Sequence, residues 1–239
     1  MVRATHCGCD GAAHHRRVNT GLFAAAAVKF LDAVQKYLRL SLYRVVTRPL
    51  RSTPGRDYAA THIRYALLTQ AELLPWCADP ELELGAQQVG AAFFRGDVCA
   101  GAFDGDKLIG YQFFAFRPTP LSEDVWVEFG PHYRYSYKKL VREEYRGQRI
   151  AAGLSSLADG LCRARGYRHT IGYIALQNRS SWRASAHLGS KTVGYAGYVE
   201  WFGLLLTFRS PGARRAAFRF LPARSIAGGM PSRHRPRLR

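Results

Sequence analysis

Residues 133–151 read YRYSYKKLVREEYRGQRIA, and this stretch decides the fold. Tyrosines alternate with polar residues from Tyr133 to Tyr137, which is the period-two pattern of a strand with two different faces. The alternation then slips by one position at Lys138–Lys139, as the extra residue of a β-bulge would make it slip. The segment therefore predicts a strand over 133–141 with a bulge near Lys138–Lys139.

A turn and an amphipathic helix follow this strand. An apolar stripe predicts a helix over 146–165 that ends before Gly166: Ile150, Leu154, Leu157 and Leu161. The first four N–H groups of a helix lack intrahelical partners, and the helix dipole adds positive potential there. Arg146 and Arg149 are unfavourable at this end unless an anion binds between them. The turn therefore predicts a phosphate site, and the alternative is that Glu143 and Glu144 simply pair with these arginines.

The rest of the middle of the chain alternates strand and helix patterns. We expect strands over 62–68, 98–103, 108–116, 169–175, 192–202 and 204–208. Thr69, with Glu72 three residues later, predicts the capping box of a short helix. Further helices are expected over 82–94 and after Asn178, a hairpin turn at 104–106, and a surface loop over 117–131.

The net charge of +18 lies at the two ends of the chain. Residues 61–208 hold 16 Lys and Arg against 14 Asp and Glu, whereas residues 209–239 hold nine Arg and no acid. We expect a disordered polar tail over 1–21, an amphipathic helical segment over 22–48, a linker over 49–60, the folded domain over 61–208 and a basic tail over 209–239. The segment over 22–48 either packs on a protein surface or lies on an anionic membrane.

Cysteine usage indicates a reducing compartment. The five cysteines are odd in number and irregularly spaced, so no disulfide framework is expected. Cys7 and Cys9, near His6, His14 and His15, match no common zinc spacing, so we expect no metal. No apolar run approaches the ~20 residues that span a bilayer. We expect a cytoplasmic protein, with contact to the inner face of the membrane through its basic ends as an open alternative.

Two motifs carry a family resemblance. The turn over 141–151 resembles motif A of the GNAT N-acetyltransferase superfamily, which has Arg/Gln-x-x-Gly-x-Gly/Ala at this place. Asn178-x-x-Ser181, followed by Leu188-Gly189, is similar to the next motif of that family. The resemblance covers residues 61–208 and implies an α/β (α+β) fold. Such a fold has a mixed, mostly antiparallel central sheet, splayed middle strands and flanking helices.

The resemblance also implies an activity. Family members are acyl-CoA-dependent N-acyltransferases, which by default transfer acetyl from acetyl-CoA to a small-molecule primary amine by direct attack. It implies that the pantetheine arm lies between the strands over 133–141 and 169–175. The residues implied to bind coenzyme A are Leu140, Val141, Arg146, Gly147, Gln148, Arg149, Ile150, Ala151, Asn178 and Ser181.

The sequence departs from the family pattern at two positions. Arg149 replaces the first glycine of the turn, and we expect helical backbone angles at this arginine. Ser185 stands where a tyrosine often protonates the leaving thiolate, so His187, Tyr195, Tyr198 or water are the alternative acids.

Four residues are candidates for the base that deprotonates the amine: Glu128, His132, Tyr135 and Tyr137. Glu128 and His132 flank the start of the strand and are preferred, because the tyrosines are explained equally well as a packed strand face. The bulge supplies a free backbone N–H near Leu140–Val141 for the oxyanion.

A binding protein is the competing class. A catalytically inactive GNAT-like module with basic ends would bind acidic polymers, such as nucleic acid or anionic polysaccharide, or a membrane surface. Residues 209–239 carry few aromatic residues besides Phe218 and Phe220. We therefore expect no specific nucleic-acid recognition.

Overall fold

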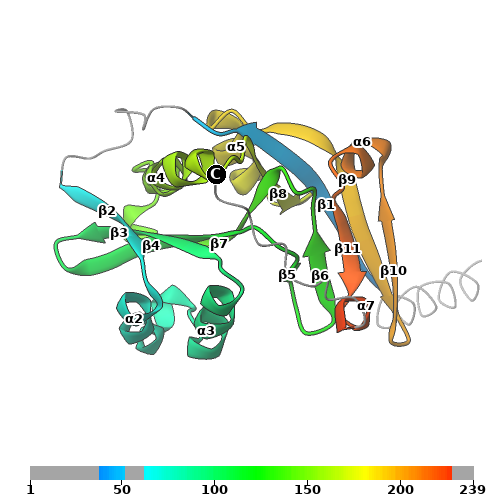
Figure 1. Ribbon diagram of the computed structural model, residues 1–239, viewed down its shortest axis with the longest axis horizontal. Coiled ribbons are helices and arrows are strands. Elements are labelled where there is room, and N and C mark those ends of the chain that lie inside the picture. The colour runs from blue at the N-terminus through cyan, green and yellow to red at the C-terminus, as the bar shows by residue number, and fades with distance from the viewer. Residues whose placement is uncertain (1–37, 52–61, 228–239) are drawn as a thin grey trace, which may run out of the picture. The chain divides into compact units, whose positions relative to one another are not determined.

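The computed structural model describes residues 38–51 and 62–227. Eight strands form the main sheet in the order β10-β9-β1-β8-β7-β4-β3-β2 (Figure 1). They are β1 (Leu38–Pro49), β2 (Ile63–Leu68), β3 (Val98–Asp104), β4 (Lys107–Ala115), β7 (Tyr133–Val141), β8 (His169–Ala175), β9 (Lys191–Trp201) and β10 (Leu204–Arg209). The fold is mixed α/β with a mostly antiparallel sheet, as expected.

The two central strands, β7 and β8, are parallel and separate along their length. They pair only from Tyr133 to Tyr135 with His169 to Ile171. By contrast, β4 pairs with β7, and β1 pairs with β8, in antiparallel ladders of six and seven residue pairs. The sheet therefore opens between β7 and β8 beyond Tyr135, which confirms the predicted splayed middle strands.

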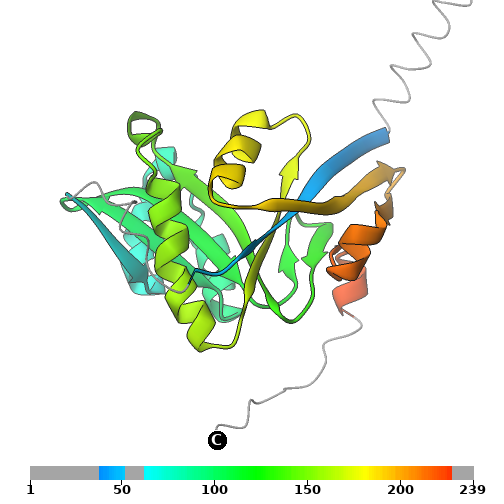
Figure 2. The same ribbon diagram turned by 90° about the horizontal axis from the view of Figure 1, so that it is seen from above.

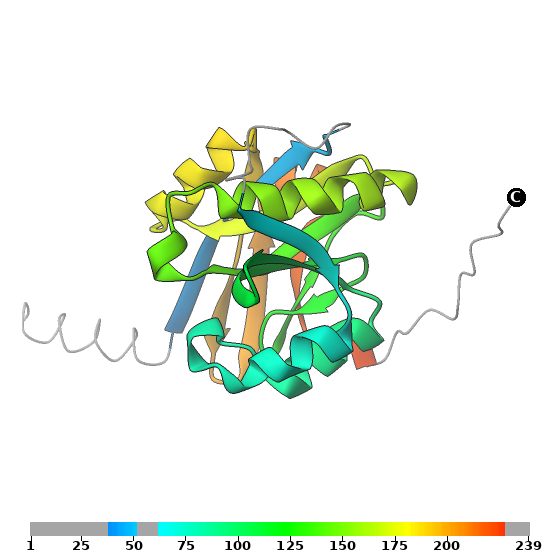
Figure 3. The same cartoon turned by 90° about the vertical axis from the view of Figure 1, so that its left-hand side faces the viewer.

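Helices cover both faces of the main sheet. On one face lie α4 (Ile150–Ala164) and α5 (Arg179–His187) (Figure 2). On the other face lie α2 (Gln70–Leu73), the 3₁₀ turns η2 (Leu74–Ala78) and η3 (Pro80–Leu82), and α3 (Ala86–Phe94) (Figure 3). A further 3₁₀ turn, η4 (Glu143–Tyr145), connects β7 to α4. None of the helices in the described part is long and apolar enough to cross a membrane.

A second sheet corrects two predictions. It has the order β11-β6-β5 and comprises β5 (Thr119–Pro120), β6 (Val125–Glu128) and β11 (Arg219–Pro222). Val125 and Val127 are fully buried, so the predicted surface loop over 117–131 contains the two strands β5 and β6 and a buried stretch. The predicted basic tail also begins too early, because α6 (Pro211–Arg215), β11 and α7 (Arg224–Ala227) are ordered elements. Phe218 and Phe220 tie this part to the core.

Strand β1 corrects the prediction of a helical segment over 22–48. Residues 22–37 lie outside the described residues, but Leu38–Pro49 is a strand between β8 and β9. Leu38, Leu40 and Leu42 alternate with Arg39, Ser41 and Tyr43, a strand pattern that the helical spacing concealed. Since Pro49 ends this strand, the predicted linker over 49–60 starts too early, and the predicted limits of 61 and 208 are too narrow.

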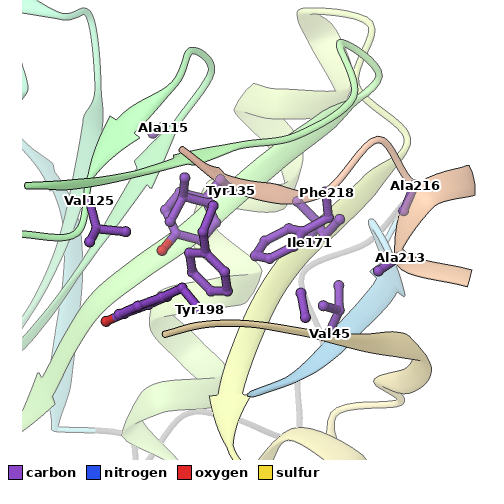
Figure 4. Close-up of a cluster of buried hydrophobic side chains, with 12 residues drawn as sticks. Val45, Ala115, Val125, Tyr135, Ile171, Tyr198, Ala213, Ala216 and Phe218 are labelled. Carbon is purple, nitrogen blue, oxygen red and sulfur yellow. The ribbon is translucent and has the colours of Figure 1, made fainter. Parts of the chain in front are cut away.

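Three apolar clusters form the core. One gathers Tyr135, Ile171, Tyr198 and Phe218 between the main sheet and the second sheet (Figure 4). The second lies under α2 and α3, and the third under α4. Tyr135 and Tyr137 therefore face the second sheet and α3, whereas α4 covers the opposite face.

Several local predictions are confirmed. Thr69 and Glu72 form the capping box of α2, and the β3–β4 hairpin turns at Gly105-Asp106. The bulge is also present, because Gln112 pairs with Lys139 and Phe113 with Tyr137. Lys138 is the extra residue and has a φ of 39°.

Candidate active site

The opening between β7 and β8 leads into a cavity of about 270 Å³. Its walls come from β1, β4, β7, β8, α4 and α5. Beyond the last paired residues, Gly172 of β8 faces Ser136 of β7. A Cβ added to Gly172 would make an ordinary contact, 3.5 Å from the Ser136 carbonyl oxygen, so only a larger side chain there would obstruct the gap. The cavity is large enough for a narrow, flexible ligand lying between the two strands.

A hydrogen-bonded chain forms the polar wall of the cavity. The side-chain amide of Gln112 donates to Ser136 Oγ, and Ser155 Oγ donates to Gln112 Oε1 at 2.9 Å. Gln112 is 3% exposed, so these partners hold its orientation. The chain links β4, β7 and α4 across the wall, which fixes the positions of the two serine hydroxyls.

The charge of the lining is positive. Among the described residues that line the cavity are Arg48, Lys138 and Lys139, and none is Asp or Glu. Lys138 Nζ donates to the neutral side chain of Gln88, at Oε1 and 2.5 Å, and Glu83 is a nearby carboxylate. Burial lowers the pKa of both lysines. Lys139 is an exposed residue that also lines the cavity. The cavity therefore favours an anionic ligand.

A buried cluster of ion pairs adjoins the cavity lining at Arg48. Arg48 donates to both carboxylate oxygens of Asp159, at 2.8 and 2.9 Å, and Arg134 donates to the same carboxylate. Arg134 is fully buried and also donates to Thr170 Oγ1 at 2.9 Å. Two arginines share one carboxylate, so the cluster adds to the positive charge behind the lining.

The turn before α4 has the shape of an anion-binding loop. Gly147 has a φ of 85°, and a Cβ added there would meet open space. No side chain caps the start of α4: the Ala152 N–H donates to the Arg149 carbonyl at 2.9 Å, whereas the N–H groups of Ile150 and Ala151 have no partner among the described residues and can meet a ligand. Arg149 at the N-cap has a φ of 59° and a ψ of 18°. The expected helical conformation of Arg149 is therefore wrong, and the residue adopts the left-handed conformation that glycine takes without strain.

Arg142 and Arg146, which flank this turn, differ in burial and in their ion pairs. Arg142 is buried, pairs with Asp79 and Glu81, and donates from Nε to the Leu108 carbonyl at 2.8 Å. It anchors the turn to η3 and β4. Arg146 is 65% exposed and meets Glu143 at 3.4 Å, a pair that solvent screens strongly.

The alternative prediction, that Glu143 and Glu144 pair with the arginines of the turn, therefore applies only to Glu143 and Arg146. Glu144 pairs with Lys107 instead, at 3.1 Å. Arg149 has no ion pair within the described ranges, so its charge stays available at the start of α4.

Five of the residues predicted to bind the cofactor lie at the end of β7, in the turn or at the start of α4: Leu140, Val141, Gln148, Ile150 and Ala151. Ile150, the first residue of α4, is buried against the sheet, and Gln148 Nε2 donates to the Glu144 carbonyl oxygen at 3.4 Å. Asn178 caps α5, because its side-chain oxygen accepts the Ser181 N–H at 2.9 Å. Ser181 lines the cavity and Asn178 does not.

The predicted catalytic residues divide into two groups. Tyr135, Tyr137 and Ser185 line the cavity. The rings of Tyr135 and Tyr137 stack at a centroid distance of 5.5 Å. Burial raises the pKa of both hydroxyls well above the ordinary value. Neither tyrosine is therefore an anionic base in the resting protein.

Glu128 and His132 do not line the cavity. The Glu128 carboxylate pairs with Arg219 of β11, the strand that the sequence assigned to a tail. His132 is exposed in the turn before β7. The second sheet therefore holds the Glu128 carboxylate outside the lining, and the role of either residue as the base stays a prediction. The alternative acids His187, Tyr195 and Tyr198 also lie outside the lining.

Sequence reasoning missed the residues that come from distant segments. Arg48 of the lining pairs with Asp159, Gln112 of the lining bonds Ser155, and Arg95 and Asp97 meet Tyr137. Arg48 and Asp159 are 111 residues apart, so no local motif connects them. The sequence pattern that could have identified them is a charged residue on an otherwise apolar face of a strand or helix. Within the described ranges, no three His, Cys, Asp or Glu side chains lie close enough together to hold a metal ion.

Comparison with protein-family models and with curated protein sequences finds no match. Several solved structures have a similar arrangement. A GCN5-related N-acetyltransferase from Sphaerobacter thermophilus is 14% identical, with a TM-score of 0.48, over 78% of this chain and 56% of that one. Another, from Kribbella flavida, is 11% identical with a TM-score of 0.47, over 80% and 66%. A functionally unknown conserved protein from Staphylococcus epidermidis is 10% identical with a TM-score of 0.49, over 73% and 68%.

These similarities are weak, and the chain spans between 56% and 68% of the length of the three structures. Two of the three are described as members of the superfamily that the sequence motifs resemble.

Proposed function

We propose that this protein is an acyl-CoA-dependent N-acyltransferase that transfers acetyl from acetyl-CoA to a primary amine by direct attack. One observation carries the proposal: β7 and β8 separate beyond Tyr135 and Ile171, next to an uncapped helix start. A pantetheine arm is long, thin and rich in amides, so it suits a gap between two strands with unpaired backbone edges. The pyrophosphate suits free N–H groups at the start of α4.

The charges of the site support an anionic cosubstrate. The cavity lining has Arg48, Lys138 and Lys139 and no carboxylate. Arg146 and Arg149 stand at the turn, and Arg149 has no ion pair among the described residues. Coenzyme A carries a pyrophosphate and a 3′-phosphate, which would compensate this charge. Asn178 and Ser181 are proposed to contact the pantetheine arm from α5.

The chemistry requires an oxyanion site and a proton donor. The bulge at Lys138 interrupts the β4–β7 ladder, and an N–H near Leu140–Val141 is proposed to bind the developing oxyanion. Ser185 lines the cavity at the position expected for the acid. A serine hydroxyl is a weak acid, so water held by Ser185 is proposed to protonate the thiolate.

Isothermal titration with acetyl-CoA tests the cosubstrate and its site. Arg146→Ala should weaken binding by about ten- to hundredfold, since a charge-assisted hydrogen bond contributes about 1.5–3 kcal/mol and 1.4 kcal/mol corresponds to a factor of ten. Arg214→Ala is the matched control, because Arg214 is an exposed arginine on α6. Wild-type protein that produces no heat, or equal affinities for the two variants, would contradict the proposal.

The basic ends favour a second, non-catalytic property. Residues 209–239 hold nine arginines and no acid. We propose salt-sensitive contact with an anionic membrane or acidic polymer as an addition to the enzyme function, or as its replacement if acetyl-CoA does not bind. Liposome co-sedimentation at two salt concentrations tests it, and binding that is equal at both would count against it.

A further inference from the structure

Three side chains form a closed hydrogen-bonded cluster beside the cavity. Tyr137 belongs to β7 and lines the cavity, whereas Arg95 and Asp97 lie between α3 and β3. The Tyr137 hydroxyl donates to Asp97 Oδ2 at 2.5 Å. Arg95 Nη2 donates to the same carboxylate oxygen at 2.7 Å and to the Tyr137 oxygen at 3.2 Å. Asp97 therefore lies one hydrogen bond away from the cavity lining.

The hydrogen bonds of Tyr137 determine what it can offer a ligand. A phenol has one O–H donor and two acceptor positions. The proton of Tyr137 is directed to Asp97, and Arg95 takes one acceptor position. The remaining acceptor position suits an N–H group of an amine. A tyrosine of this kind receives a proton from a ligand most easily when it can pass its own proton to the carboxylate.

The cluster is not explained by packing alone. The Asp97 side chain is 1% exposed, and Asp97 Oδ1 and Arg95 Nε are buried with no hydrogen-bond partner among the described residues. Unsatisfied buried polar atoms destabilise a fold, so a functional reason is expected where they occur. Burial raises the pKa of Asp97, while Tyr137, Arg95 and Arg117 oppose that rise. A carboxylate with a raised pKa is a better base near neutral pH.

Other carboxylates are less suited to accept a proton from the cavity. Glu128 is paired with Arg219, and Asp159 is held by Arg48 and Arg134. Neither is linked to the lining through a hydroxyl group that exchanges protons.

We propose that Asp97 is the proton acceptor of the transfer reaction and that Tyr137 relays the proton to it from the acceptor amine. The proposal rests on the proposed acyltransferase function. Tyr137 contacts the amine and is the catalytic residue. Asp97 acts through Tyr137, and Arg95 positions both side chains.

Acyl transfer with this relay conserves atoms, charge and electrons. The amine nitrogen forms a bond to the thioester carbonyl carbon, and the C=O π electrons move to oxygen. The excess proton on nitrogen passes to the Tyr137 oxygen while the proton of Tyr137 passes to Asp97 Oδ2. The C=O bond then re-forms and the C–S bond breaks. Asp97 releases its proton to solvent and the thiolate takes one up, so the products are an amide and a thiol.

Two substitutions test the relay. Asp97→Asn keeps the shape of the side chain but cannot take a proton, and Tyr137→Phe removes the hydroxyl. The matched control is Asp104→Asn, because Asp104 also accepts a tyrosine hydroxyl, that of Tyr145 at 2.8 Å, and neither residue lines the cavity. Circular dichroism melting checks that each variant is folded.

Release of coenzyme A is measured by chromatography with acetyl-CoA and three amine probes, glucosamine, spermidine and glycinamide, and with water alone. We expect Asp97→Asn and Tyr137→Phe each to lower the rate by at least about 100-fold, the range of general-base catalysis. The double variant should lose no more than either single variant, and the acetyl-CoA Kd should stay unchanged. The wild-type rate should fall as pH drops through the Asp97 pKa, and this acid limb should be absent in Asp97→Asn.

The failures are distinguishable. Wild-type protein that accelerates none of the four reactions overturns the proposed function, and the relay with it. An active wild type whose Asp97→Asn variant keeps the rate and pH profile of Asp104→Asn overturns the relay alone. A folded Tyr137→Phe variant with full activity has the same effect.

Discussion

Removing the negative charge of Asp159 should strongly destabilise the folded protein. Asp159 is 1% exposed and accepts four hydrogen bonds. Two come from Arg48, one from Arg134, and one from the backbone N–H of Arg51 at 2.9 Å. Asp159→Asn replaces an acceptor by an NH₂ group that faces these donors. Two buried guanidinium groups would then lack a counter-charge.

The magnitude follows from the burial of all three charges. Breaking a buried ion pair by removing one partner costs about 3–5 kcal/mol. A protein of this size loses about 2–4 °C of Tm for each kcal/mol, so we expect Tm to fall by about 6–20 °C. The loss is large compared with the total stability of about 5–15 kcal/mol that is usual for a folded domain.

Urea and thermal unfolding followed by circular dichroism measure the effect. Glu144→Gln is the control, because the Lys107–Glu144 pair is half-exposed and screened by solvent, so its Tm should equal that of the wild type. The reasoning would be refuted if Asp159→Asn melted within about 2 °C of the wild type with an unchanged denaturant dependence.

Three further predictions concern the turn, the gap and the buried thiols. Arg149→Gly should raise stability by about 1 kcal/mol, because Arg149 has left-handed backbone angles, and equal or lower stability in urea would argue against strain there. Gly172→Leu should abolish acetyl-CoA binding in titration calorimetry, whereas Gly172→Ala should retain it, since an added Cβ makes an ordinary 3.5 Å contact; binding by both would place the arm elsewhere. Cys99 and Cys162 should resist alkylation at pH 8 in peptide mapping, because burial raises the pKa of both thiols; rapid labelling of either would show that the core opens.

The elements with strong local patterns were predictable from the sequence. The strand over 133–141, its bulge and the helix that ends before Gly166 depend on side-chain alternation, a one-residue slip and an apolar stripe. Each of these patterns spans only a few neighbouring residues, so it can be recognised without knowing which distant segments pack against it. The same holds for the capping box at Thr69 and the cap at Asn178.

The elements at the margins were not predictable in this way. Strand β1 has a spacing that suits a helix as well as a strand, and its place between β8 and β9 decides the outcome. β11 is a short strand in a basic segment, and its pairing with β6 becomes favourable only when Phe218 and Phe220 are buried. Tertiary burial outweighs local preference at these positions.

The sequence by itself therefore determined the strand–turn–helix unit and the cationic, uncapped helix start, because both depend on neighbouring residues and on the geometry of a helix end. The tertiary structure alone decided which ionisable groups meet. It brought Arg48 to Asp159 and Asp97 to Tyr137, and it took Glu128 away from the site by pairing it with Arg219. Proton transfer and ion pairing act over a few ångströms in space, and separation along the chain carries no information about that distance.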